Sequence, residues 1–362
     1  MRYEQLADTI GDTPLVKLRL DERAVGSVYA KLELMNPFGM KDRVAKQSVL
    51  AAIQSGELQA GMPIIESSSG TLACGLALVG RQLGHDVHIV TDPRIDPITY
   101  AKLTSLGCHV HVVSQMGKQG WQSARLERLQ ELMREYPGAF WPRQYENPEN
   151  PRAYAALASE LMQDLERIDV LVGAVGSGGS LSGTARELKR HNKELRVVAV
   201  DAAGSVIFGQ PDQPTRLQGG LGNSLVAKNV DFSVIDEVHW LNDAEAFAAT
   251  LQLARNEHIF AGNSSGSVYA VANWLASQVG SECNIVAILP DRGDRYIDTI
   301  YSDSYRENKG LMQTNLPDTP QCVEPKTVVT SWSYSKLMGM YPNEQTLSVR
   351  RSEYDGDRYA RY

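Results

Sequence analysis

The sequence predicts an α/β protein whose mainly parallel sheets are covered by helices on both faces. Three observations lead to this prediction. Short runs rich in β-branched residues recur up to residue 288, and longer amphipathic stretches separate them. Strand-length runs that alternate with helical stretches are typical of parallel sheets. Glycine- and serine-rich turns follow several of the runs, at the points where a strand gives way to a helix.

Short apolar segments rich in valine and isoleucine are expected to be strands. These segments are residues 28–32, 63–66, 86–90, 109–113, 170–175, 196–200 and 284–288. Residues 118–135, 152–165 and 244–256 have the periodicity of amphipathic helices. Residues 141–148 contain two prolines and interrupt the alternation, so they predict a crossing between two lobes.

The interruption divides the chain into a larger lobe, residues 1–40 and 150–308, and a smaller lobe, residues 41–149. After about Lys309 the sequence is polar, with scattered prolines and tyrosines and no strand–helix alternation. Residues 309–362 are therefore predicted to be a C-terminal extension, partly ordered, that wraps a neighbouring subunit.

Composition argues against several classes of protein. The 362 residues are 43% hydrophobic, enough for a large core, and the net charge of −7 comes without a basic block that would bind nucleic acid. Apolar runs such as 285–289 fall far short of the roughly 20 residues of a membrane-spanning helix. The first five residues lack a signal-peptide core. Four widely spaced cysteines argue against a zinc site and a disulfide framework, so the expected location is a reducing cytoplasm.

One lysine stands at a predicted junction between a loop and a helix. Residues 36–43 read NPFGMKDR, so Lys41 follows a Pro-Phe-Gly turn and opens the helical stretch 44–50. A lysine held there and partly desolvated has a lowered pKa, and its neutral amine can form a Schiff base. The alternative is an ordinary surface lysine, which is the commoner case for an isolated lysine.

A second turn, residues 176–183 (GSGGSLSG), follows the predicted strand 170–175 and opens a helix. Small residues let backbone N–H groups close around a phosphate, and the helix dipole favours its negative charge. Nucleotide-binding loops look similar, but a dinucleotide fingerprint is expected near the first strand, with an acid about twenty residues further on. This turn lies in mid-chain and contains serines, which favours the phosphate of pyridoxal phosphate (PLP).

A third turn, Ser68-Ser69-Gly70-Thr71, also lies between a predicted strand and a helix, residues 72–83. Its hydroxyl and N–H groups are suited to hold the α-carboxylate of a substrate. The alternative is helix N-capping by Ser69, worth about 1 kcal/mol, and the two readings are compatible.

Together, the lysine and the two turns resemble the cysteine synthase and cystathionine β-synthase family of fold-type II PLP enzymes. Three further segments match motifs of that family: GDTPLV at 11–16, GNSSG at 262–266 and PDRGDRY at 290–296. The motifs keep the family's order and approximate spacing over about residues 8–305. The resemblance implies two lobes, each with a twisted, mainly parallel sheet, and a homodimer.

The resemblance also implies roles for individual residues. Lys41 carries PLP and is the catalytic residue. The phosphate contacts fall on Gly176, Ser177, Gly178, Gly179 and Ser180. The residues that face the substrate carboxylate are Ser68, Ser69, Gly70 and Thr71, and Thr71 also faces the ring hydroxyl. Ser264 matches the serine that faces the pyridine nitrogen; its alternative role is a helix N-cap.

The implied chemistry is β-replacement on an activated L-serine, in which Lys41 removes the α-proton and a nucleophile adds at Cβ. Residues 200–209 (VDAAGSVIFG) and 291–296 resemble the branch that makes N-(2-amino-2-carboxyethyl)-L-glutamate from O-phospho-L-serine and L-glutamate. Arg125 and Tyr145 lie where that branch contacts its substrate; the alternatives are a solvated helix arginine and a tyrosine at the lobe junction. Because that branch tends to have serine at position 176, O-acetyl-L-serine and a sulfur nucleophile remain open.

Two other functions are compatible with the sequence. A serine or threonine dehydratase would use the same fold but let water complete the reaction. A degenerate paralogue would bind a partner through its C-terminal extension. The lysine loop is one residue shorter than in the family and lacks its serine, and Thr71 stands where the family has asparagine.

Overall fold

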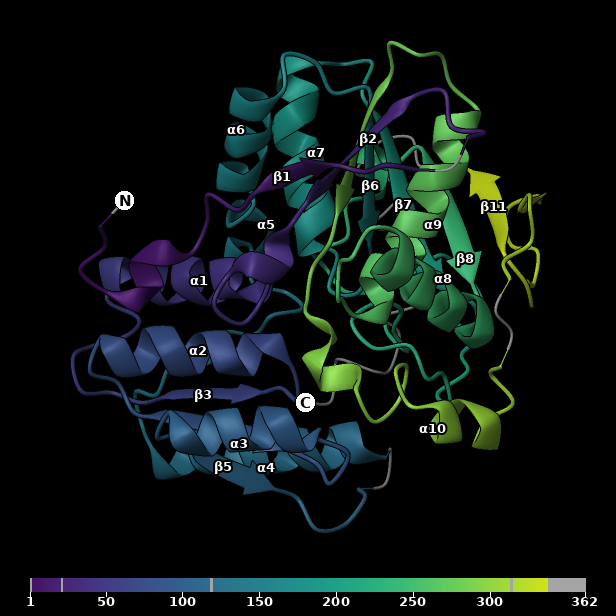
Figure 1. Ribbon diagram of the computed structural model, residues 1–362. Helices are drawn as coiled ribbons and strands as arrows, with labels where there is room; N and C mark the ends of the chain where they lie inside the picture. The colour runs from purple at the N-terminus through teal and green to yellow at the C-terminus, as the bar shows by residue number, and fades with distance from the viewer. Residues whose placement is uncertain (1, 21, 118–119, 313–314, 338–362) are drawn as a thin grey trace.

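The computed structural model describes residues 2–20, 22–117, 120–312 and 315–337, which form two sheets flanked by helices (Figure 1). The order of the larger sheet is β1 (Leu15–Lys17), β2 (Ser27–Lys31), β9 (Asn284–Ile288), β6 (Val170–Ala174), β7 (Arg196–Ala202), β8 (Glu237–Leu241), β11 (Ser333–Lys336) and β10 (Gln321–Cys322). Strands β2, β9, β6, β7 and β8 run parallel, while β1 and β11 are antiparallel to β2 and β8. The predicted α/β fold with mainly parallel sheets is confirmed.

Helices cover both faces of the larger sheet. One group is α5 (Glu149–Arg152), α6 (Ala155–Asp164) and α7 (Gly179–His191), and the other is α8 (Asp243–Asn256) and α9 (Asn263–Ser277), with α10 (Asp303–Asn308) further along the chain. Strand β6 shows why both faces are covered. Val170 and Val172 pack in the cluster that contains Leu275 of α9, while Leu171 packs with Leu181 of α7. A strand that is apolar on both sides requires a helix on each.

The smaller sheet has three parallel strands, β3 (Ile64–Ser67), β4 (Val87–Thr91) and β5 (His109–Val112). Its helices are α1 (Lys41–Ser55), α2 (Thr71–Gln82), α3 (Pro97–Ser105) and α4 (Trp121–Glu135). Figure 1 shows α1, α2 and β3 stacked in that order, and α1 also contacts α5. All three strands lie within residues 41–149, the range proposed for the smaller lobe.

All seven predicted strands are present, but β1, β8, β10 and β11 were not predicted. The buried strand β8 contains Glu237 and His239, whose side chains lie 2.8 Å apart, and Glu237 also pairs with Arg196. Because these polar side chains interrupt the apolar residues of β8, the sequence of this segment does not show the apolar run of a buried strand. Strands β10 and β11 are short, and they add the first part of the predicted C-terminal extension to the edge of the larger sheet. Residues 338–362 lie outside the described chain, and their contact with a neighbouring subunit stays a prediction.

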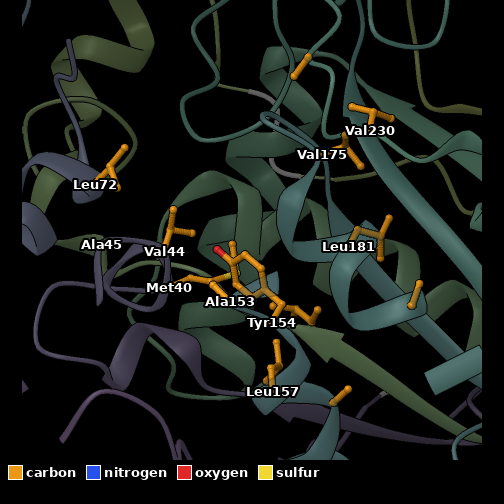
Figure 2. Packing of buried hydrophobic residues seen from close by; sticks show 14 of the residues in the cluster. Met40, Val44, Ala45, Leu72, Ala153, Tyr154, Leu157, Val175, Leu181 and Val230 are labelled. Atoms are coloured by element: carbon orange, nitrogen blue, oxygen red, sulfur yellow. The ribbon is translucent and has the colours of Figure 1, made fainter. Parts of the chain in front are cut away.

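A hydrophobic cluster fixes the start of α1 against the larger lobe. Figure 2 shows Met40 and Val44 beside Ala153 and Tyr154, the residues that join α5 to α6. All four side chains are at most 7% exposed. The beginning of α1 is therefore held by close packing from both lobes.

A buried ion network reinforces the same junction. The Arg43 guanidinium, in the first turn of α1, makes paired hydrogen bonds to the carboxylates of Glu33 and Glu160 at 2.7–2.8 Å. Glu160 lies on α6 and also accepts the Lys31 ammonium at 2.9 Å. Burial raises the pKa of Glu160, but Arg43 and Lys31 outweigh it and hold that pKa at about 2. The network therefore ties α1 to the larger lobe through charge-assisted bonds.

The described ranges contain neither a membrane-spanning helix nor a cluster of metal ligands. No helix there combines the length and the apolar composition that a bilayer crossing requires. No group of three or more histidine, cysteine, aspartate or glutamate side chains in the same ranges is arranged to hold a metal ion.

The smaller sheet carries a histidine cluster that predicts acid sensitivity. His88 is 4% exposed, and its Nδ1 lies 3.1 Å from Nε2 of His111. Burial, with His109 and His111 as neighbours, lowers the pKa of His88 to about 4, although Asp86 and Glu135 act in the opposite direction. Between pH 6.5 and 4 the unfolded chain therefore binds more protons than the folded one, and stability falls as the pH falls. We expect a loss of up to about 3 kcal/mol from this residue by pH 4.

This expectation is checked by urea unfolding between pH 7 and 4. The wild-type midpoint should fall more steeply with decreasing pH than that of His88→Phe, which cannot be protonated. His191→Phe is the control, because the His191 side chain is 60% exposed. Parallel pH profiles for wild type and His88→Phe would refute the expectation.

Candidate active site

A cavity of about 680 Å³ lies at the carboxyl ends of strands from both sheets, where sites form in open parallel α/β sheets. The predicted site residues that line it are Lys41, Ser68, Ser69, Gly70, Thr71, Arg125, Tyr145 and Ser264. The structure thus brings together side chains from five separate segments of the chain.

Lys41 is the first residue of α1, and its amine lies in this cavity. Burial lowers the pKa of Lys41; Asp291 opposes this effect and Arg295 adds to it. A lowered pKa makes the neutral form of the amine, with its free lone pair, easier to reach, so Lys41 is suited to act as a nucleophile or as a base.

The turn before Lys41 is fixed by backbone contacts. The Met40 N–H donates to the Pro290 carbonyl at 2.9 Å, just after β9, and the Asp42 carboxylate accepts the Phe38 N–H at 2.7 Å. Gly39 has a φ of +133°, and a side chain there would come within 3.1 Å of the Pro290 oxygen. The glycine of the predicted Pro-Phe-Gly turn is therefore required by both conformation and space.

The turn between β3 and α2 is held by an arginine from the smaller lobe. The Arg125 guanidinium, on α4, donates to Oγ of Ser69 at 2.9 Å and lies 3.5 Å from the Asp92 carboxylate. Its side chain is only 18% exposed, so the alternative of a solvated helix arginine is wrong. Burial raises the pKa of Tyr145, with Arg125 opposing, so the phenol is neutral.

Two N-cap alternatives are also wrong. The N-cap of α2 is Gly70, without a side-chain cap, and the Ser69 hydroxyl instead contacts Thr91 at 2.9 Å. Helix α9 begins at Asn263 after the N-cap Gly262, so Ser264 lies inside its first turn. Neither hydroxyl therefore caps its helix.

The predicted phosphate turn, Gly176 to Ser180, is not among the residues that line the cavity around Lys41. It lies at the N-terminus of α7, where Gly178 is the N-cap with a φ of +81°. A side chain at Gly176 would come within 3.3 Å of the Gly220 carbonyl, and Gly220 itself lines the cavity. The Ser177 hydroxyl accepts a hydrogen bond from the Asn150 amide at 3.2 Å.

Ser264 and Gly220 shape one wall of the cavity. A side chain at Gly220 would approach Oγ of Ser264 to 3.4 Å, so glycine keeps this wall open. The Ser264 hydroxyl is buried and makes no hydrogen bond of normal geometry within the described ranges, although it helps to lower the pKa of the neighbouring Asp291.

Sequence reasoning missed several charged residues of the cavity, among them Asp291, Arg295 and Glu66. Asp291, directly after β9, accepts the Tyr296 hydroxyl at 2.7 Å, and burial raises its pKa. The Arg295 guanidinium donates to the Ser69 carbonyl at 3.2 Å and to Asp96 at 3.1 Å, both in the smaller lobe. The segment PDRGDRY had been used only as a family motif. Its position at the carboxyl end of a central strand was the available signal.

Glu66, another missed carboxylate, stabilises the crossing segment. Its side chain accepts the Ser67 N–H at 2.7 Å and the Trp141 indole N–H at 3.2 Å. Burial raises the pKa of Glu66 to about 7. Trp141 begins the segment that carries Tyr145, so Glu66 links strand β3 to that wall of the cavity.

The arrangement combines a buried amine of lowered pKa, a turn that two arginines hold, and a buried hydroxyl. An amine of this kind can form a covalent bond to a carbonyl group and exchange protons with a bound molecule. The turn at Ser69 offers N–H and hydroxyl donors beside two cations, which suits a carboxylate or a phosphate.

Comparison with known proteins agrees with this chemistry. Residues 6–291 match the family model described as pyridoxal-phosphate dependent enzyme. Two curated relatives are named N-(2-amino-2-carboxyethyl)-L-glutamate synthase. The relative from Ralstonia nicotianae is 39% identical in sequence, and the matched region covers 84% of this chain and 91% of the relative. The relative from Cupriavidus metallidurans is 40% identical, and the matched region covers 84% of this chain and 92% of the relative. The crystal structure of cysteine synthase from Entamoeba histolytica superposes with a TM-score of 0.78 at 28% sequence identity. The match covers 86% of this chain and 96% of that structure.

The family match spans most of the chain, and the site contains the buried lysine that such chemistry requires. The chain belongs to the family of pyridoxal-phosphate dependent enzymes, and pyridoxal phosphate is its cofactor.

Proposed function

We propose that the protein catalyses β-replacement on an activated L-serine, with O-phospho-L-serine as donor and the amine of L-glutamate as nucleophile. The observation that carries the proposal is Lys41, a buried amine of lowered pKa beside a turn that two arginines hold. The names of the two curated relatives support the choice of L-glutamate.

The residues of the site fit the cofactor. Lys41 offers its amine to the aldehyde, and the turn Gly176 to Ser180 offers the N–H groups at the start of a 13-residue helix to the phosphate. The Ser264 hydroxyl, which is buried without a normal hydrogen bond among the described residues, is available to the pyridine nitrogen. Thr71 lines the cavity on the side proposed for the ring hydroxyl. When bound, PLP supplies the electron sink that acidifies the α-proton of an amino acid.

The protein's own groups then bind, orient and move protons. Ser68, Ser69, Gly70 and Thr71 receive the α-carboxylate, and Lys41 takes the α-proton and later returns it to Cα. In the overall reaction the Cβ–O bond of the donor breaks and a Cβ–N bond to the nucleophile forms. The amine's proton leaves with the released group as HPO₄²⁻, so charge and atoms balance.

The electrostatics of the turn support phosphate as the leaving group. Arg125 and Arg295 both donate to Ser69, one to its hydroxyl and one to its carbonyl, and Tyr145 adds a neutral hydroxyl donor. A dianionic phosphate gains more from two cations than the ester oxygen of an acetyl group does. O-acetyl-L-serine is the second donor to be tested.

The test starts with the visible spectrum of the purified PLP-loaded protein. O-phospho-L-serine alone is expected to shift the cofactor band and release phosphate once per site; O-acetyl-L-serine should do so more slowly. Added L-glutamate should restore the band and start turnover, with sulfide and thiosulfate as competing nucleophiles. If neither ester shifts the band nor loses its leaving group, the proposal fails. Steady pyruvate formation without a nucleophile would instead establish the dehydratase.

Two assignments rest on the family resemblance and on the cysteine distribution. We propose a homodimer, which sedimentation equilibrium of the full chain would test, and a cytoplasmic location, which fractionation of the source cells would test.

The contacts of Arg295 predict a positioning role. Arg295→Ala would remove both hydrogen bonds that join the larger lobe to Asp96 and Ser69. We expect kcat/KM for the serine ester to fall about a hundredfold, because the carboxylate turn loses its fixed position. Arg295→Lys keeps the charge without the paired geometry and should lie between wild type and alanine. A kcat/KM of Arg295→Ala within about twofold of the wild-type value would contradict this role.

A further inference from the structure

The solvent-open end of the active-site cavity carries two cations that the chemistry at Lys41 does not use. Arg143, from the crossing segment, and Lys228, from the loop between β7 and β8, both line the cavity. Their side chains are 55% and 53% exposed, so they stand at its opening. Both approach the same carboxylate, Glu146, at 4.0 and 3.1 Å. Two chain segments far apart in sequence therefore bring positive charge to one point.

The backbone holds Arg143 in an unusual conformation. Its φ is +50°, a region that costs a non-glycine residue about 1–3 kcal/mol. Its carbonyl accepts the N–H groups of Glu146 and Asn147, both at 3.0 Å, which fixes the turn. Its guanidinium lies 5.2 Å from the ring of Trp141, a further residue of the cavity wall. The arginine is thus held at the opening of the cavity by backbone and aromatic contacts.

The charges at the opening favour a carboxylate. Among the residues that line this end of the active-site cavity, Arg143 and Lys228 exceed Glu146 by one positive charge, and Gln144, Gln122 and Gln130 are neutral amides. Glu57 and Glu149 lie on the other side, in a neighbouring cavity that Arg143 and Lys228 also border. Sulfide is small and needs no such contacts. An acidic amino acid that adds through its amine must place that amine near Cβ while its side-chain carboxylate points outward, towards the cations.

We propose that Arg143 and Lys228 form the subsite for the side-chain carboxylate of an acidic amino acid that serves as the nucleophile. This inference rests on the proposed function and deepens it. In the free protein Glu146 interacts with both cations, and the entering carboxylate takes its place between them. The subsite selects the nucleophile, whereas the turn at Ser69 selects the donor.

The experiment uses the PLP-loaded full chain and separates the two half-reactions. Phosphate release from O-phospho-L-serine without a nucleophile should stay within about twofold of wild type in the variant Arg143→Gln/Lys228→Gln. KM for L-glutamate should rise at least about tenfold, as expected for a lost charge-assisted hydrogen bond. L-Glutamine, the neutral analogue, should be the poorer nucleophile for wild type, and this preference should disappear in the double variant.

Two further variants control for charge and for structure. Arg190→Gln removes a 66% exposed arginine of α7 that pairs with Glu187, and it should leave KM unchanged. Glu146→Gln should lower KM for L-glutamate, because it removes the competing carboxylate.

A normal half-reaction with an unchanged KM in the double variant overturns the subsite and leaves the proposed function intact. A rise in KM for Glu146→Gln as large as that of the double variant also overturns it, because the three residues would then act only as a structural unit. If no serine ester reacts, the proposed function fails and the subsite fails with it.

Discussion

Lys41→Ala is expected to abolish turnover and the absorption band of the lysine-bound cofactor. The buried amine is proposed both to hold the aldehyde and to move the α-proton, and its removal takes away both functions at once. Loss of a positioned general base alone lowers a rate about 10²–10⁴-fold. The checks are the visible spectrum of the purified variant and its initial rate with O-phospho-L-serine and L-glutamate.

Lys46→Ala is the matched control for this experiment. Lys46 lies on the same helix, and its ammonium donates to the Ala7 carbonyl at 3.0 Å outside the cavity. This variant should keep the band and most of the activity. A Lys41→Ala protein that is yellow through a lysine-bound cofactor and fully active would refute the assignment of Lys41.

Arg43→Ala is expected to cause the largest loss of stability. It leaves Glu33, which is 0% exposed, without its buried cation partner, and leaves Glu160 with Lys31 alone. Breaking one partner of a buried ion pair destabilises a protein by about 3–5 kcal/mol, since the remaining charge is uncompensated. Urea unfolding at pH 7 measures the effect.

Arg43→Lys extends the test if the alanine variant does not fold. It keeps the charge but cannot make paired hydrogen bonds to two carboxylates, so a smaller loss is expected. Arg152→Ala removes an exposed arginine and should change the unfolding free energy by less than about 0.5 kcal/mol. A loss below about 1 kcal/mol for Arg43→Ala would contradict the importance of the network.

Much of the fold could be predicted because its signals are local. The apolar runs of β6 and β9 and the glycine of the lysine turn act within a few residues of where they stand. Strand β8 shows the limit. Its Glu237 and His239 are buried only because they satisfy each other and Arg196, which comes from the neighbouring strand β7. A pairing of this kind exists only in three dimensions.

In the candidate site, too, local signals could be predicted from the sequence and long-range contacts could not. Lys41 and the turn at Ser68 to Thr71 have local signatures, and they do line one cavity. The contact of Arg295 with the Ser69 carbonyl joins residues far apart in the chain, and nothing near Arg295 in the sequence indicates which lobe it faces. The paired cations Arg143 and Lys228 were missed for the same reason, because each resembles a solvated side chain until the fold brings them to one carboxylate.

The hydrogen bond from Met40 to the Pro290 carbonyl has a consequence for biosynthesis. Strands β3, β4 and β5 leave the ribosome close together and can pair early, whereas β2 must wait for β9, its partner from the far part of the chain. Lys41 follows directly on Met40, so its position is fixed only after β9 has been translated and has joined the sheet. The nascent chain can therefore bind the cofactor only late in its synthesis. A polypeptide that ends before β9 lacks a formed site even though it contains Lys41.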